Sequence, residues 1–450
     1  MATRASDDFT LLEGIRGTAV PLEGNFRDYD ALLEDIGEAR VVLLGEATHG
    51  TEEFYRERGL ITRRLIAEKD FAAVAVEADW PDAYRANRYV RGISSDSDAI
   101  QSLDGFAQFP TWMWRNHAVV DFIEWLREFN EAHHEAWSAV GFYGLDLYSL
   151  YASIDQVIAY LSTVDPEAAA RARERYACFD RADRNANTYA WMAAHRSDVS
   201  CEQAAVEQLV ELLDNRSRYL AEDEVLAEDE FFFAEQNARL AHTAERYYRT
   251  MYQGGTSSWN LRDRHMAETL KELMRHLSDR VENPKVVVWA HNSHLGDARF
   301  TSMGRAGEWN VGQLIRQEYG DAAFLVGYTT HRGTVTAASN WDEPADRRQV
   351  RPAIEQSYED LFHRAGLDRF YLRLRDPGEA LGGLHEERLE RAIGVVYHSH
   401  SERASHYFLC DIARQFDGVL HFDETTALEP LERTPRWESG EPPETWPTSL

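Results

Sequence analysis

Three short apolar segments of the chain each end in ionisable side chains of the kind that acid–base catalysis needs. The segment VVLLGEATHG places Glu46 and His49 three positions apart, FAAVAVEADW contains Glu77 at its end, and KVVVWAHNSHLGD carries His291 and His294. Histidine suits a general base because its ordinary pKa lies near neutrality, and a carboxylate can hold the imidazole in one tautomer. We therefore predict that His49 activates water and is oriented by Glu46 or Glu77.

Three further side chains complete the predicted chemistry. Arg58 follows His49 by about two helical turns, and its rigid fork of donors could bind a developing oxyanion or a substrate carboxylate. His291 and His294 are predicted to supply further donors or the acid that protonates a leaving alcohol. This set predicts hydrolysis of an ester by a His-activated water.

A metal site is the main alternative, because the same residue types bind metals. His291, His294 and Asp297 are spaced so that two or three of them could bind one ion, and Glu46, His49 and Glu77 would complete a mixed nitrogen and oxygen shell. Against this, the sequence has no HExxH motif. We assign no metal ligand and no cofactor.

The segment HSHSERASH is a second group of histidines, namely His398, His400 and His406. It could bind a ligand, but a polar loop near the same crevice is favoured, with His406 facing substrate. No GxSxG elbow and no GxxxxGK[ST] or GxGxxG loop occurs, which disfavours covalent serine catalysis and phosphate chemistry.

The elements that must position these residues alternate between strands and helices. Hydrophobic runs predict strands at 40–44, 71–77, 138–143, 285–290, 323–328, 370–374, 392–397 and 417–422. A helix is predicted over 52–68, and the pattern is helical between about 150 and 280. The predicted fold class is α/β, with a mostly parallel central sheet flanked by helices and a large helical insertion. In such sheets ligands bind beyond the carboxyl ends of the strands, where the candidate residues lie.

This pattern divides the chain into four parts. Residues 1–150 and 285–432 are predicted to form the two halves of the α/β core, residues 151–284 a helical insertion or lid, and residues 433–450 a loosely ordered tail rich in Pro and Glu. Most aromatic residues are expected in the core, although four tryptophans could line an apolar substrate cleft: Trp80, Trp112, Trp114 and Trp259.

Composition limits the partners. The chain has 48 Lys and Arg residues against 77 Asp and Glu residues, a formal net charge of -29, which disfavours nucleic acid and anionic membranes. Only three of the basic residues are lysines, and an acidic, lysine-poor surface favours adaptation to a salt-rich cytoplasm. No apolar stretch is long enough for a membrane helix, and the N-terminus lacks the apolar core of a signal peptide, so a cytoplasmic protein is expected.

The three cysteines, Cys178, Cys201 and Cys410, form no CxxC pair. A disulfide framework or thiolate zinc site is therefore not expected, and all three are predicted to be buried small hydrophobes.

Taken together, the motifs resemble those of the erythromycin esterase family. The resemblance rests on GEATHG, EADW, SWNLRDRHMAE, AHNSHLGD, SHYF and QFDGVLHFDETTALEPLE, and it spans about residues 30 to 432. It implies an α/β core with a helical insertion, and hydrolysis of an ester or lactone by a His-activated water without a required metal. The family's motif residues carry over onto Glu46, His49, Arg58, Glu77, His291 and His294.

The resemblance makes a small ester or lactone the expected partner, and macrolide resistance is one possibility within this class. The alternative function is a metal-dependent hydrolase, or a protein of the same fold that binds a metal or a haem-like ligand.

Overall fold

The computed structural model describes residues 2–133, 138–196, 199–220, 224–253 and 256–440. A single mixed sheet forms its centre, with the strand order β1-β8-β11-β6-β2-β5-β3-β4 and with β7 paired to β6. Its strands are β1 (Val20–Pro21), β2 (Val41–Leu44), β3 (Ala73–Asp79), β4 (Gly141–Asp146), β5 (Val286–Trp289), β6 (Ala323–Ala337), β7 (Asp346–Val350), β8 (Arg369–Arg373) and β11 (Gly418–Thr425). A separate two-stranded sheet pairs β9 (Arg388–Arg391) with β10 (Tyr407–Cys410).

The middle of the main sheet is parallel from β11 through β6, β2, β5 and β3 to β4, whereas β8 and β7 pair antiparallel. This confirms the predicted α/β class. Seven of the eight predicted strands overlap a strand of this sheet. The strand predicted at 392–397 is wrong: within the described chain these residues form isolated bridges at Ile393 and Val396, and the strand lies just before them at β9. Strand β9 was not predicted because its sequence is mostly charged. Its side chains make buried polar contacts instead of forming an alternating apolar face.

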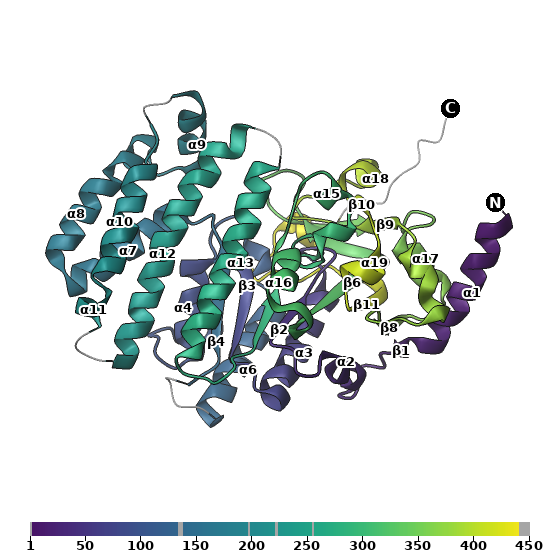
Figure 1. Cartoon of the computed structure of the whole chain (residues 1–450). Helices are drawn as coiled ribbons and strands as arrows, with labels where there is room; N and C mark the ends of the chain where they lie inside the picture. The colour runs from purple at the N-terminus through teal and green to yellow at the C-terminus, as the bar shows by residue number, and fades with distance from the viewer. Residues whose placement is uncertain (1, 134–137, 197–198, 221–223, 254–255, 441–450) are drawn as a thin grey trace.

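Helices cover both faces of the sheet (Figure 1). Those outside the predicted insertion are α1 (Ala2–Thr18), α2 (Asp30–Ile36), α3 (Glu52–Lys69), α4 (Trp80–Val90), α5 (Ala99–Ser102), α6 (His117–His133), α14 (Asn292–Leu295), α15 (Ser302–Arg305), α16 (Val311–Tyr319), α17 (Tyr358–Arg364), α18 (Glu402–Ser405), α19 (Ile412–Gln415) and α20 (Pro435–Ser439). The helix predicted over 52–68 is α3. Of the predicted tail, residues 441–450 lie outside the described residues.

A group of helices fills the predicted insertion and forms one end of the molecule (Figure 1). It comprises α7 (Leu150–Val164), α8 (Pro166–Tyr176), α9 (Ala186–His195), α10 (Glu202–Asp214), α11 (Arg216–Tyr219), α12 (Glu224–Thr250) and α13 (Ser257–Ser278). Helix α13 packs against α12, α16 and β4, so it joins this group to the sheet. Among the described residues, no helix is both long enough and apolar enough to cross a membrane.

The central strands are buried on both faces. Along β2, Val41 and Leu43 face one hydrophobic cluster, while Val42 and Leu44 face the other. Each of these four side chains is fully buried. Continuous apolar runs are typical of parallel strands that have helices on both sides, which explains why the sequence reads as uninterrupted valines and leucines.

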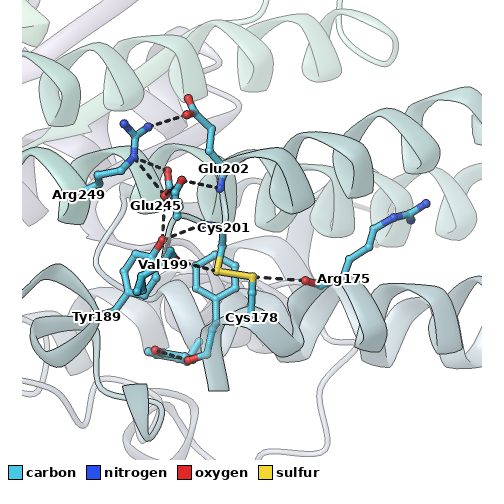
Figure 2. The surroundings of a disulfide bond; sticks show 11 residues. Arg175, Cys178, Tyr189, Val199, Cys201, Glu202, Glu245 and Arg249 are labelled. Atoms are coloured by element: carbon cyan, nitrogen blue, oxygen red, sulfur yellow. Dashed lines mark hydrogen bonds and ion pairs between the residues drawn. A yellow bond between two sulfur atoms is a disulfide. The ribbon is translucent and has the colours of Figure 1, made fainter. Parts of the chain in front are cut away.

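Two of the cysteines form a disulfide, so the prediction of buried small hydrophobes without a disulfide is wrong for Cys178 and Cys201. Cys178 lies in the 3-10 helix Ala177–Ala182, Cys201 immediately precedes α10, and their Cα atoms are 6.0 Å apart (Figure 2). The backbone N–H of Cys201 donates to the hydroxyl of Tyr189, which in turn donates to Glu245 on α12. Packing of these helices brings together two cysteines 23 positions apart, a spacing that carries no motif. Cys410 is buried and free, as predicted.

Candidate active site

The three strands that end in candidate residues are neighbours in the sheet. Strand β5 lies between β2 and β3, and all three are parallel, so their carboxyl ends meet at one edge. Glu46 and His49 follow β2, Glu77 lies in β3, and His291 and His294 follow β5. None of these five residues exposes more than 7% of its surface. The structure therefore brings together the acids and bases that the strand-end pattern selects.

His49 and Glu46 form a directly bonded pair. Nδ1 of His49 lies 2.9 Å from Oε1 of Glu46, whereas its Nε2 lies 4.0 Å from Oε1 of Glu77. The sequence leaves open which carboxylate meets His49, and in the structure it is Glu46 that contacts the ring directly. Because Nδ1 donates to Glu46, Nε2 of the neutral ring has a free lone pair, as a general base requires.

Arg58 supports Glu46 from inside the core. Its guanidinium lies 2.9 Å from Oε2 of Glu46 and is packed over the rings of Tyr55 and Trp289. Arg58 is fully buried, so this geometry does not support the predicted contact with an oxyanion or a substrate carboxylate. The contact places a fixed positive charge behind Glu46 instead.

Glu77 is a carboxylate held by several donors. Its Oε1 accepts a hydrogen bond from Arg262 at 2.7 Å, and its Oε2 accepts one from the backbone N–H of His291 at 2.9 Å. Burial alone would raise the pKa of Glu77, but His294, His49 and Arg262 outweigh burial and lower it. Glu77 therefore contributes a fixed negative charge between the two imidazole rings.

His294 is held by Glu77 and by two residues of α13 that are not among the predicted site residues, Arg262 and Asp263. Its Nδ1 lies 2.9 Å from Oδ1 of Asp263, and its Nε2 lies 3.0 Å from Nη1 of Arg262 and 3.4 Å from Oε1 of Glu77. Burial opposes a charged ring, yet Asp263 and Glu77 raise the pKa of His294. The same guanidinium of Arg262 also pairs with Asp146 at the end of β4. Both α13 residues lie in the SWNLRDRHMAE motif, which was the available signal.

The neutral form of His291 has a defined tautomer. Its Nδ1 accepts a hydrogen bond from the backbone N–H of Ser293 at 3.2 Å, which leaves the ring proton on Nε2. Burial and the neighbouring His49 lower the pKa of His291 well below its ordinary value, so the ring is neutral near neutral pH. The ring centroids of His291 and His49 are 4.8 Å apart.

The predicted substrate-binding residues divide into two groups. The ring of Trp259 stacks on His294, with 4.5 Å between centroids, and Trp259 lines a narrow recess with Ser293 and Glu308. Three other tryptophans lie in the hydrophobic core, so their positions do not support a role in a cleft: Trp80, Trp112 and Trp114.

His406 contacts its own loop. Its Nε2 accepts a hydrogen bond from the backbone N–H of His398, and its ring packs on Tyr397. Asp297, proposed as a third ligand beside His291 and His294, instead pairs with Arg299. Within the described part of the chain, no group of three or more His, Cys, Asp or Glu side chains is arranged to hold a metal ion.

Comparisons with known proteins agree with this architecture. The family model for erythromycin esterase matches residues 66–425. The erythromycin esterase type II of Escherichia coli is 21% identical over 427 residues, covering 90% of this chain and 94% of that protein. A Bacillus cereus protein of known structure gives a TM-score of 0.79 at 21% identity, covering 94% of this chain and 99% of that chain.

Two further solved structures share the fold. A succinoglycan biosynthesis protein gives a TM-score of 0.76 at 20% identity, and an erythromycin esterase mutant in its open conformation gives 0.67 at 16% identity. Each match covers 94% of this chain and 98% of the other.

Proposed function

Because the chain belongs to the erythromycin esterase family, we propose that it hydrolyses a carboxylic ester or lactone with a water molecule activated by His49. The observation that carries the proposal is the 2.9 Å contact between Nδ1 of His49 and Glu46, which leaves Nε2 as the basic nitrogen. A base held in this way deprotonates water more readily, because the carboxylate stabilises the imidazolium that forms.

In the proposed reaction, His49 takes one proton from water and later gives it to the leaving oxygen. Nε2 of His49 takes a proton from water, and the hydroxide attacks the carbonyl carbon of the ester. The Nε2–H of neutral His291 is proposed to donate to the oxyanion. When the carbon–oxygen bond breaks, the imidazolium of His49 returns its proton to the leaving oxygen. His294, held by Asp263, is the second candidate for that transfer.

The two arginines have separate roles in this proposal. Arg58 pairs with Glu46 and holds it in place, and it does not touch substrate. Arg262 pairs with both Glu77 and Asp146, and its side chain is more accessible than that of Arg58. We assign the substrate to the ester and lactone class. Macrolides are included because one relative of this chain is an erythromycin esterase.

The proposal is tested by turnover of a panel of esters and lactones, macrolides included. His49→Ala should abolish turnover while leaving the fold intact, because a general base contributes about 10²- to 10⁴-fold. His117→Ala, which changes an exposed histidine on α6, is the matched control. Full activity of His49→Ala would refute the mechanism.

The same assay separates the alternatives. Removal of metal by a chelator should leave the rate unchanged. A loss that added zinc or manganese restores would instead assign a metal-dependent hydrolase. An absence of turnover by metal-replete protein would favour the ligand-binding alternative.

A further inference from the structure

A buried carboxyl group borders the catalytic loops and is held by neutral donors. Glu390, on β9, is fully buried. Its Oε1 accepts a hydrogen bond from Nδ2 of Asn292 at 3.1 Å, and its Oε2 accepts one from Sγ of Cys410 at 3.1 Å. The carboxyl group of Glu359 is also close enough to raise the pKa of Glu390. An ionised Glu390 would therefore be a buried charge beside another carboxyl group and held by neutral donors, which is costly.

Asn292 connects this carboxyl group to the site. It lies between His291 and His294 in the sequence and is fully buried. Its Nδ2 donates to the carbonyl of Tyr328 at 2.8 Å as well as to Glu390, and its Oδ1 accepts from the backbone N–H of Tyr328. Its backbone N–H donates to the carbonyl of Glu46 at 2.8 Å. One side chain thus joins the loop after β5 to β6 and β9, and its backbone joins that loop to the loop after β2.

The chain that continues from β9 holds the other side of the loop after β2. The backbone N–H of Ile393 donates to the carbonyl of Ala47 at 2.8 Å, and the backbone N–H of His49 donates to the carbonyl of Ile393 at 3.3 Å. Packing here is close, because a Cβ added at Gly45 would lie 2.2 Å from Oδ1 of Asn292. A small shift of Glu390 or Asn292 would therefore displace the loop that carries His49, the proposed general base.

We propose that Glu390 is a positioning residue of this site, which holds Asn292 and the catalytic loops in place as a neutral carboxylic acid, and whose ionisation ends activity at alkaline pH. This inference rests on the hydrolase function proposed above. It adds a pH-dependent support to the same site.

The groups that face Glu390 agree with a neutral acid. Burial raises the pKa of Glu390 to about 8, and Glu359 on α17 acts in the same direction, against the hydrogen bonds from Cys410 on β10, Asn292 on α14 and Gln415 on α19. Burial also raises the pKa of Glu359 and of the Cys410 thiol. Above about pH 8, movement of the neighbouring side chains would lower the energetic cost of an ionised Glu390. Asn292 is the neighbour that contacts the catalytic loops.

Glu390→Gln is the decisive variant, because glutamine reproduces the size and neutrality of the protonated acid. We would measure kcat and KM of wild type and this variant from about pH 6 to about pH 10. Glu386→Gln, an exposed carboxylate just before the same strand, is the matched control. Wild type and the control should lose kcat by about tenfold per pH unit above about pH 8, whereas Glu390→Gln should keep its neutral-pH kcat. An unchanged alkaline limb in Glu390→Gln would overturn the inference.

Two further measurements keep the test independent of folding and of the proposed function. Glu390→Ala should lower kcat by about tenfold at neutral pH with little change in KM, because Asn292 loses its acceptor. Urea unfolding against pH needs no substrate: relative to Glu390→Gln, wild type should lose stability as the pH rises from about 4.5 to about 8, with no further loss above that range. The absence of this difference overturns the inference even where the ester panel shows turnover dependent on His49. The difference without any turnover overturns the proposed function instead, and with it the positioning role of Glu390 in catalysis.

Discussion

Replacement of Glu46 by Gln tests the central contact of the site. The two carboxylate oxygens lie 2.9 Å from Nδ1 of His49 and 2.9 Å from the guanidinium of Arg58. Glutamine has the same shape but carries no charge, so the variant removes the charge that faces the imidazolium. Unit charges about 4 Å apart attract by about 4 kcal/mol at an effective dielectric constant of about 20. Since about 1.36 kcal/mol corresponds to a factor of ten, we expect kcat to fall by about 10³-fold.

The fall should appear in kcat, with little change in KM, because His49 becomes charged only as the reaction proceeds. The assay is steady-state hydrolysis of whichever ester the wild type turns over best. Glu57→Gln is the matched control, since Glu57 is buried on the same helix as Arg58 and contacts Tyr29. A Glu46→Gln variant within about threefold of wild type in kcat/KM would refute the reasoning.

Glu46→Gln also leaves Arg58 without its carboxylate, so its folding must be measured separately. Breaking a buried ion pair from one side costs about 3–5 kcal/mol. The double variant Glu46→Gln with Arg58→Met should recover part of this stability, since both charges are then removed. Its kcat should stay low, because His49 still lacks its carboxylate. Recovery of stability without recovery of rate separates the catalytic role of Glu46 from its structural role.

Four other predictions concern the rest of the molecule. Replacing both Cys178 and Cys201 by Ser should lower the free energy of unfolding by about 3 kcal/mol, as expected for a closed loop of this length. Denaturant unfolding of the variant and of reduced wild type would measure this loss. The pKa of Glu390 is raised by burial from 4.5 to about 8, so the native protein keeps a proton that the unfolded chain releases, and stability should fall as the pH rises through this window; urea midpoints that rise over that window would contradict it. Asp263→Asn should lower kcat by about 10²-fold by removing the charge that holds His294, and an unchanged rate would exclude His294 from the chemistry. The chain has 77 acidic residues and 48 basic ones, so salt should screen the repulsion between carboxylates and raise the melting temperature. A melting temperature independent of salt would reject adaptation to a salt-rich cytoplasm.

The strand-end residues were predictable because two simple rules act together. A run of buried β-branched residues predicts a parallel strand, and parallel neighbours present their carboxyl ends at one edge. Glu46, Glu77 and His291 each follow or end such a run, and β2, β5 and β3 proved to be adjacent. The same rule should have found Asp146. The predicted strand over 138–143 stops before it, whereas the observed β4 spans Gly141–Asp146 and ends on that residue.

The residues that come from the helical insertion could not be predicted in the same way. On a long helix such as α13, the charged Arg262 and Asp263 resemble any solvated face, because periodicity identifies an apolar face but not the partner that a polar side chain meets. The partners of Arg262 are Glu77 and Asp146, which lie 185 and 116 positions away in the sequence. The disulfide could not be predicted for the same reason. Cys178 and Cys201 are brought together by the packing of helices and not by a local motif.

These contacts make the predicted helical insertion and the proposed catalytic site energetically dependent on each other. Arg262 is the cation shared by Glu77 and Asp146, two carboxylates at the ends of neighbouring strands. If α13 were displaced, both carboxylates would remain in the site without that cation, and buried charges deprived of a partner are strongly destabilising. His294 would lose Asp263 in the same movement, because Asp263 is the next residue of the same helix. The proposed site is therefore complete only when α13 is docked on the sheet, so a helix of the predicted insertion helps to build it.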